Sequence, residues 1–322
     1  AGGGLGIAYI PANAIINDYF EKKRTLAFGI ATSGFGVGSF LYPLLIEALN
    51  EEYGWRGAML MLSGIGLNIC VCGVLMCPFR TNELLTESAN NETLFNFGIM
   101  KSMNFLILCF NYLVFHFGIV IVFTHLSEYS LLMGIGGSES SMLFSVFGIT
   151  NIVGLLLFGV IAHHPKADAM LLFIGGLLIC GVATVFLPLL TQYGALLAYS
   201  GLIGIFSATM GVLSPGIVCQ ILGPNELSNG YGATMPCAAF GVLLGGPVAG
   251  FMYDTLHSYD GSFFLGGGAM IISALCMVVP FLRKKHNWSK NDLEGVSYNL
   301  QPLLDEKLKN VSNNNYVGNT KK

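Results

Sequence analysis

Nine stretches of this sequence are each long and apolar enough to cross a lipid bilayer as a helix. A spanning helix needs about 20 mostly apolar residues, because the hydrocarbon core is roughly 30 Å thick and each helical residue rises about 1.5 Å. The first stretch is marginal in length and the other eight are not. The expected spans cover residues 1–17, 25–49, 57–79, 102–124, 141–162, 169–190, 195–219, 230–253 and 262–282.

Charge content and strand pattern decide the fold class. Charged residues make up 10% of the chain, well below the roughly 25% of an ordinary soluble domain. Backbone amides in lipid must be satisfied internally, so the spans are expected to be helices. The alternating pattern of a membrane barrel is absent. The sequence therefore predicts an all-α membrane protein.

The basic residues between the spans gather on one side. The chain has 15 Lys and Arg residues, and all but Arg56 fall in the gaps after the first, third, fifth and last expected spans. Cytoplasmic loops carry the excess of positive charge in membrane proteins, so this side is predicted to face the cytoplasm. The polar tail 283–322 is then cytoplasmic, and its composition predicts disorder.

Cysteine placement and polar clustering exclude several classes of function. All eight cysteines lie inside expected spans, so we interpret them as packing residues and expect neither an extracellular disulfide framework nor a metal site. Asp, Glu, His and Ser residues do not cluster as an intramembrane hydrolase requires. The glycines at 34, 36 and 38 lie within a span and indicate helix packing, not a phosphate loop. No enzyme activity, cofactor, metal or nucleic-acid partner is predicted.

A polar stretch at 80–101 separates three expected spans from six. Six spans make a natural transporter half, so we predict that 1–79 is the remainder of an N-terminal half and 102–282 a C-terminal half. The stretch 80–101 would be the central cytoplasmic loop and 283–322 the tail. The odd count of spans, and a first residue that is not Met, indicate a chain truncated at its N-terminus.

Two glycine-rich spans form a faint internal repeat. Each follows a predicted cytoplasmic loop and leads to a proline. Gly34 and Gly38 in the first, like Gly241 and Gly245 in the second, have the four-residue spacing that lets helix backbones approach closely. Matching segments are expected in transporters built from repeated bundles. Glycine-rich membrane helices also resemble one another by composition, so the repeat alone decides nothing.

The loop entering the second span carries the most specific pattern. It reads Tyr19-Phe20-Glu21-Lys22-Lys23-Arg24-Thr25-Leu26-Ala27-Phe28-Gly29-Ile30-Ala31-Thr32-Ser33-Gly34. This run resembles the YFxKRRxLAxGxAxAG motif of the monocarboxylate transporter family, within the major facilitator superfamily. The resemblance covers residues 1 to about 285. Further matches follow in the expected order: Tyr53-Gly54-Trp55-Arg56-Gly57, Gly246-Pro247-x-Ala249-Gly250, Tyr253-Asp254 and Ser258-Tyr259-Asp260.

The resemblance implies a major facilitator-type bundle and a transport function. The present spans would be family helices four to twelve, so nine of twelve expected helices are present and helices one to three are missing. The implied activity is transport of small organic anions, monocarboxylate-like, by alternating access in the plasma membrane. A proton is the expected partner of symport, and some members require a single-span immunoglobulin-type accessory protein.

The basic loop has two interpretations. Positive residues where a span emerges into the cytoplasm anchor a helix to anionic headgroups, which we favour for Lys22 and Lys23. Arg24 is alternatively a gate residue that pairs with an acidic group in one conformation, and both interpretations stay open for it. By resemblance, the functionally sensitive motif positions are Arg24 and Gly34. Tyr19 and Phe20 open the motif.

The sequence departs from the family at the site for proton and carboxylate. Proton-coupled members have an Asp and an Arg at the cytoplasmic end of helix eight, whereas this chain has His163 and His164. Histidine titrates near pH 6.5 and can carry a proton or bind a carboxylate when charged. The alternative, which we favour, is a pair of solvated histidines in a loop. Proton coupling is therefore uncertain.

Polar residues inside the spans are the remaining candidates for a substrate or proton pathway. His116 lies in the middle of the span 102–124, where an ionisable group is costly and usually faces a cavity or a partner. Asn111 and Asn151 are further buried candidates. The alternative for His116 is a neutral side chain hydrogen-bonded between helices.

Two other functions stay open: a uniporter of a neutral or zwitterionic metabolite such as an amino acid, creatine or carnitine, and a non-transporting sensor.

Overall fold

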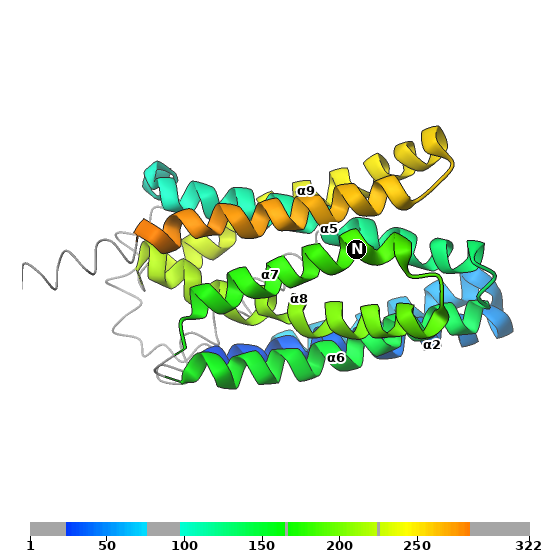
Figure 1. Ribbon diagram of the computed structural model, residues 1–322. Coiled ribbons are helices and arrows are strands. Elements are labelled where there is room, and N and C mark those ends of the chain that lie inside the picture. The colour runs from blue at the N-terminus through cyan, green and yellow to red at the C-terminus, as the bar shows by residue number, and fades with distance from the viewer. Residues whose placement is uncertain (1–23, 76–96, 165–166, 224–225, 284–322) are drawn as a thin grey trace, which may run out of the picture. The chain divides into compact units, whose positions relative to one another are not determined.

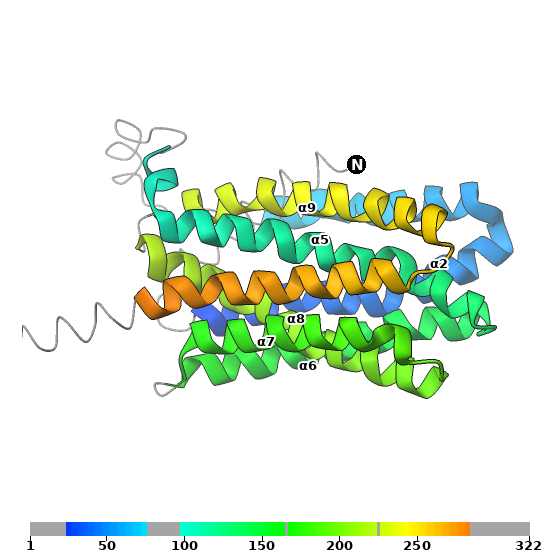
Figure 2. The ribbon, with the colours of Figure 1, turned by 45° about the horizontal axis from the view of Figure 1, so that its top comes forward.

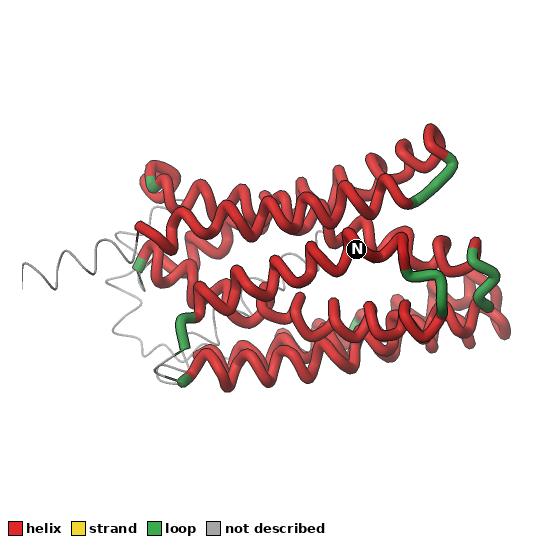
Figure 3. The backbone as a smooth tube through the Cα atoms, in the orientation of Figure 1, coloured by secondary structure: helices red, strands yellow, loops and turns green. Residues whose placement is uncertain are grey.

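The computed structural model describes residues 24–75, 97–164, 167–223 and 226–283. Within these ranges the backbone forms helices joined by short turns and no strand (Figure 3). By its internal contacts the chain divides after Met277, so residues up to Met277 form one unit and those from Val278 another. The predicted all-helical fold class is confirmed for the described residues.

The first helix, α2 (Arg24–Gly66), has 43 residues. It would measure roughly 65 Å if straight, about twice the hydrocarbon thickness. The helix is broken at Gly54, whose φ of 65° is in the left-handed region that favours glycine. The sequence predicts a loop between residues 49 and 57, whereas the structure has only the break at Gly54 there. α3 (Asn68–Leu75) follows.

Six longer elements make up the rest of the described bundle. Up to Met277 they run nearly side by side in both views (Figures 1 and 2). A short 3₁₀ turn, η1 (Phe97–Lys101), precedes them, and another, η2 (Leu187–Leu189), ends the third expected span of this region. The elements are α5 (Met103–Leu132), α6 (Gly137–His163), α7 (Ala169–Phe186), α8 (Tyr193–Leu222), α9 (Leu227–Leu256) and a last helix, Asp260–Arg283.

Seven helices in the described residues are long and apolar enough to cross a membrane. The first of them, Gly29–Val74, covers two expected spans in 46 residues. Eight of the nine expected spans therefore fall on described helices, while 1–17 lies outside the described residues. Nine of twelve helices stays a prediction. α5 extends to Leu132, beyond the expected end at residue 124, and its Glu128 accepts a hydrogen bond from Tyr259, which directly precedes the last helix.

Glycines set the closest helix crossings. A Cβ on Gly148 of α6 would lie 2.6 Å from the carbonyl oxygen of Gly36 on α2, so the two backbones touch directly. On α9, a Cβ at Gly245 would lie 2.6 Å from the carbonyl oxygen of Phe117 on α5. Van der Waals packing and small residues drive helix association in lipid, where the solvent is as apolar as the helix surfaces.

The predicted packing glycines behave differently in the two spans of the faint repeat. Gly241 and Gly245 lie against α5, which confirms their role in close packing. A Cβ on Gly34 would meet nothing within 4 Å, and one on Gly38 only its own helix's Tyr42. Among the described residues the Gly34/Gly38 pair makes no helix contact, so close packing at this pair stays a prediction. The crossing of α2 uses Gly36, which lies on another face of the helix.

Candidate functional site

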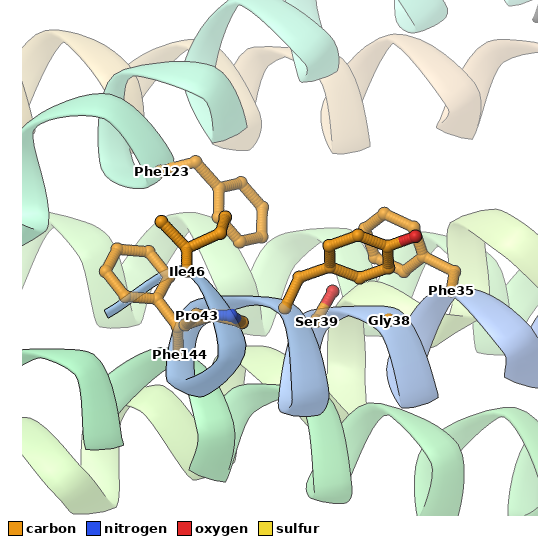
Figure 4. Close-up of a pocket in the computed structure, with 8 residues that line it drawn as sticks. Phe35, Gly38, Ser39, Pro43, Ile46, Phe123 and Phe144 are labelled. Carbon is orange, nitrogen blue, oxygen red and sulfur yellow. The ribbon is translucent and has the colours of Figure 1, made fainter. Parts of the chain in front are cut away.

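A cavity of about 540 Å³ lies between α2 and the helices α5 and α6. Ligand pockets typically measure roughly 300–1,000 Å³. Figure 4 shows side chains of α2 along one wall, with Phe123 of α5 facing them and Phe144 of α6 beside Pro43. The lining residues are Phe35, Gly38, Ser39, Tyr42, Pro43, Ile46, Phe123 and Phe144.

The α2 wall follows from helical periodicity. Its six residues recur every three or four positions, so they form one stripe along the helix. The wall is mainly apolar and aromatic, with the hydroxyls of Ser39 and Tyr42 as its polar groups. Among the described residues that line the cavity, none is Lys or Arg. A charged ligand here requires a cation from elsewhere.

The cavity lies beside the glycine crossing of α2 and α6. Next to the Gly36–Gly148 contact, the buried Ser145 donates a hydrogen bond to the carbonyl oxygen of Phe40 at 3.3 Å. Phe123 packs edge-on against Phe147, with ring centroids 4.8 Å apart, and stacks more loosely on Phe144. These contacts fix the wall that α5 and α6 present to the cavity.

Asn151 ties α6 to α8. Its side chain is buried, and Nδ2 donates to the carbonyl oxygen of Gly204 at 3.0 Å and to the Ser207 hydroxyl at 3.3 Å. Its Oδ1 has no hydrogen-bond partner in the structure. The predicted buried location is confirmed. The amide is half satisfied, which leaves one acceptor for a ligand or a water.

Asn111 makes an equivalent contact elsewhere. It is fully buried, and Nδ2 donates to the backbone oxygen of Ser273 at 2.9 Å and to the Ser273 hydroxyl at 2.7 Å. Its Oδ1 also has no hydrogen-bond partner. Asn111 therefore joins α5 to the last helix, on a different face of α5 from His116, as the five-residue spacing predicts.

His116 is half-buried on α5. Its Nδ1 donates to the carbonyl oxygen of Tyr112 at 2.8 Å, so Nε2 is the acceptor in the neutral ring. The ring stacks on Tyr112 and meets Phe115 edge-on, both at 5.7 Å between centroids. His116 precedes Phe123 by seven residues, which places both on one face of α5 about 10.5 Å apart. The contact is within α5 and not between helices.

The other predicted residues lie apart from the cavity or outside the described ranges. His163 and His164 are exposed at the end of α6, which agrees with the solvated interpretation. Tyr19, Phe20, Lys22 and Lys23 lie outside the described residues. Arg24 begins α2, but its side chain is not among those described. Gly34 is exposed on α2 and does not line the cavity.

Sequence reasoning missed a polar cluster near the C-terminal end of α5. The Tyr259 hydroxyl donates to the Glu128 carboxylate at 2.5 Å, and the Tyr259 ring stacks on Tyr253 at 4.2 Å. Burial raises the pKa of Tyr259, and the hydrogen bond to Glu128 raises it further, so the hydroxyl remains a donor at physiological pH. His125 lies 5.1 Å from the Tyr259 ring, and neither of its ring nitrogens has a hydrogen-bond partner.

A signal for this cluster was present in the sequence. Tyr253, Tyr259 and their acidic neighbours belong to the motif runs that carry the family resemblance, which implies no role for them. The cavity had a signal too, in the aromatic and hydroxyl residues repeated along 35–46. Glu128 and His125 of the cluster lie beyond the expected end of their span at residue 124, and the residues that line the cavity carry no charge.

Comparisons with known proteins agree with the all-helical membrane fold. The family model for the Major Facilitator Superfamily matches residues 1–200 and 172–316. Monocarboxylate transporter 12 of Xenopus laevis is 31% identical over 85% of this chain and 65% of its own length. Monocarboxylate transporter 12-B of Danio rerio is 30% identical over 91% and 69%. Human monocarboxylate transporter 14 is 29% identical over 88% and 71%.

The chain spans about two thirds of the length of the curated relatives that it matches. The match reaches both ends of the described helices, and it agrees with a chain built from several membrane-crossing helices. The chain is thus a multi-pass membrane protein that belongs to the monocarboxylate transporter family of the major facilitator superfamily.

Proposed function

We propose that the protein transports small organic anions, monocarboxylate-like, by alternating access across the plasma membrane, with its C-terminal tail in the cytoplasm. The cavity between α2 and the pair α5 and α6 carries this proposal. On the predicted organisation, α2 belongs to the N-terminal half and α5 and α6 to the C-terminal half. A cavity between two halves is where a rocking transporter binds its substrate.

The mechanism assigns the missing positive charge to His116. The cavity wall supplies hydroxyls but no Lys or Arg among its described residues. A protonated His116, on the same face of α5 as Phe123, would balance a carboxylate and carry one proton with it. Anion and proton would then cross together as a neutral pair, which avoids moving a bare charge through the membrane.

One observation favours the alternative substrate class, a neutral or zwitterionic metabolite. The unpartnered Oδ1 atoms of Asn111 and Asn151 are acceptors, suited to an ammonium or amide group and not to a carboxylate. A uniporter of an amino acid, creatine or carnitine would need no proton. Anion symport and neutral uniport are thus separated by their dependence on a pH gradient.

The test is uptake into proteoliposomes that contain this chain with any upstream sequence its gene encodes. The panel comprises labelled monocarboxylates, neutral amino acids, creatine and carnitine, each with and without an inward proton gradient. Anion symport predicts monocarboxylate uptake that rises with the gradient. Uptake of a zwitterion without gradient dependence would establish the alternative. Ligand binding without uptake would indicate a sensor.

The role of His116 has a matched control. In H116Q, gradient-driven uptake should fall to the level seen without a gradient. The double variant H163Q/H164Q changes two exposed histidines and should keep the wild-type dependence. Loss of the dependence in the double variant alone would transfer the proton site to the end of α6. The proposed single-span accessory protein is tested separately, by whether surface delivery in cells requires co-expression of one.

A further inference from the structure

Helices α5 and α9 run in the same direction and in fixed register. A Cβ on Gly241 would meet the carbonyl oxygen of Leu113, and one on Gly245 the carbonyl oxygen of Phe117. Each step of four residues along α9 therefore matches a step of four along α5. Residues four apart lie one above the other on a helix face, so the register extends along the interface.

One turn earlier, the same register places Cys237 of α9 opposite Cys109 of α5. The two thiol groups lie near enough for Cys237 to influence Cys109 electrostatically. Cys109 is buried, with 5% of its surface exposed, whereas Cys237 is partly exposed and its Sγ lies 3.8 Å from the backbone oxygen of Ala233. Both are free thiols. The interpretation of the cysteines as packing residues gives no reason for two of them to face each other across one interface.

The neighbouring glycine contacts favour a short backbone spacing at these two cysteines. A disulfide requires Cα atoms about 4.4–6.8 Å apart, which two helices reach only where small residues let their backbones touch. Gly241 and Gly245 continue the Cys237 ridge in four-residue steps and bring α9 against the α5 backbone. The cysteine pair therefore lies where the interface is narrow.

We propose that Cys109 and Cys237 form an oxidisable dithiol site, at which a hydroperoxide converts the pair into a disulfide that joins α5 to α9. Cys237 is the more accessible thiol and reacts first. Its sulfur attacks the distal peroxide oxygen, the O–O bond breaks, and a sulfenic acid and an alcohol or water form. The Cys109 sulfur then displaces water from the sulfenic acid. Two thiols and one hydroperoxide thus give one disulfide, one water and one alcohol, or two waters from hydrogen peroxide.

The source of the hydroperoxide is open to test. Hydrogen peroxide would reach Cys237 through water, while an apolar organic hydroperoxide would reach it through the lipid. The first arm treats the wild-type chain in lipid nanodiscs with hydrogen peroxide, and the second uses cumene hydroperoxide. Free thiols are then alkylated, and the digested protein is analysed by mass spectrometry before and after reduction with dithiothreitol.

The expected result is one reducible crosslink between the peptides that contain Cys109 and Cys237, formed in at least one arm. C109S and C237S should each abolish it. C180S, which changes a fully buried cysteine of α7, should leave its yield unchanged. Absence of the linked peptide in both arms, in wild-type protein that remains folded, overturns the proposal. So does random pairing of Cys109 with the exposed Cys70 or Cys72 at equal yield.

Discussion

The crossing of α2 with α6 and the crossing of α5 with α9 are both made by glycines, yet they are built differently. At the first, Gly36 and Gly148 face each other, so both helices give up their side chains. At the second, only α9 contributes glycines, and these lie against the backbone at Leu113 and Phe117. The first crossing borders the cavity and the second holds the thiol pair. On the predicted organisation, the first joins the two halves and the second lies within one.

This difference indicates separate tasks for the two contacts. At the first crossing, which borders the cavity and on the predicted organisation joins the two halves, the Ile152 side chain of α6 packs against Gly36 beside the Gly36–Gly148 contact. At the second crossing, the α9 glycines lie against the α5 backbone in four-residue steps, and this close contact favours one register. We therefore expect substitutions at the first crossing to affect transport and those at the second to affect stability.

The largest effect is expected for Gly148→Leu. Its Cβ would lie 2.5 Å from the amide nitrogen of Phe40 and 2.6 Å from the Gly36 oxygen, so α2 and α6 must separate. Overpacking costs about 1–3 kcal/mol. If this cost falls on only one of the two transport conformations, uptake per inserted molecule should fall about tenfold. Gly175→Leu is the control, because its Cβ would meet nothing within 4 Å. Wild-type uptake in Gly148→Leu would contradict a working role for this crossing.

Gly241→Leu should instead lower stability. The new side chain would press on the α5 backbone at Leu113, and about 1–3 kcal/mol of destabilisation is expected, seen as a lower midpoint in thermal unfolding. Uptake per folded molecule should stay near wild type. Gly246→Leu on the same helix is the control, since its Cβ would have no neighbour within 4 Å. A stable Gly241→Leu protein with impaired uptake would reverse the assignment of the two crossings.

The cavity beside the first crossing gives a smaller effect. Removing the hydroxyl in Tyr42→Phe takes away one of its polar groups without changing its size. A lost hydrogen bond to substrate is worth about 1 kcal/mol, so KM for uptake should rise about fivefold with little change in the unfolding midpoint. Tyr53→Phe removes an exposed hydroxyl of the same helix, away from the cavity, and should behave as wild type. Equal KM values for both variants would mean that substrate binds elsewhere.

Hydrophobic length predicted the described helices well, because lipid leaves a chain few alternatives to a spanning helix. The candidate site was harder to predict. The positions of Asn111, Asn151 and His116 were expected, but their partners depend on which helices become neighbours, and residue spacing carries no such information. The Gly34/Gly38 pair had the correct spacing, yet the face of α2 that meets α6 is set by Gly36. Helix contacts between distant segments are decided in three dimensions.

The smallest effect is expected for the two asparagines, which distinguish structural polar contacts from substrate contacts. Asn111→Ala removes two hydrogen bonds to Ser273, and Asn151→Ala removes those to Gly204 and Ser207. Interhelical hydrogen bonds in membranes average about 0.6 kcal/mol, so each variant should lose roughly 1 kcal/mol and melt about 2–4 °C lower. Asn50→Ala, at an exposed asparagine of α2, should leave the midpoint unchanged. If KM also rises in either buried variant, its Oδ1 contacts the substrate; if only the midpoint falls, the asparagine joins helices and the uniport alternative loses its support.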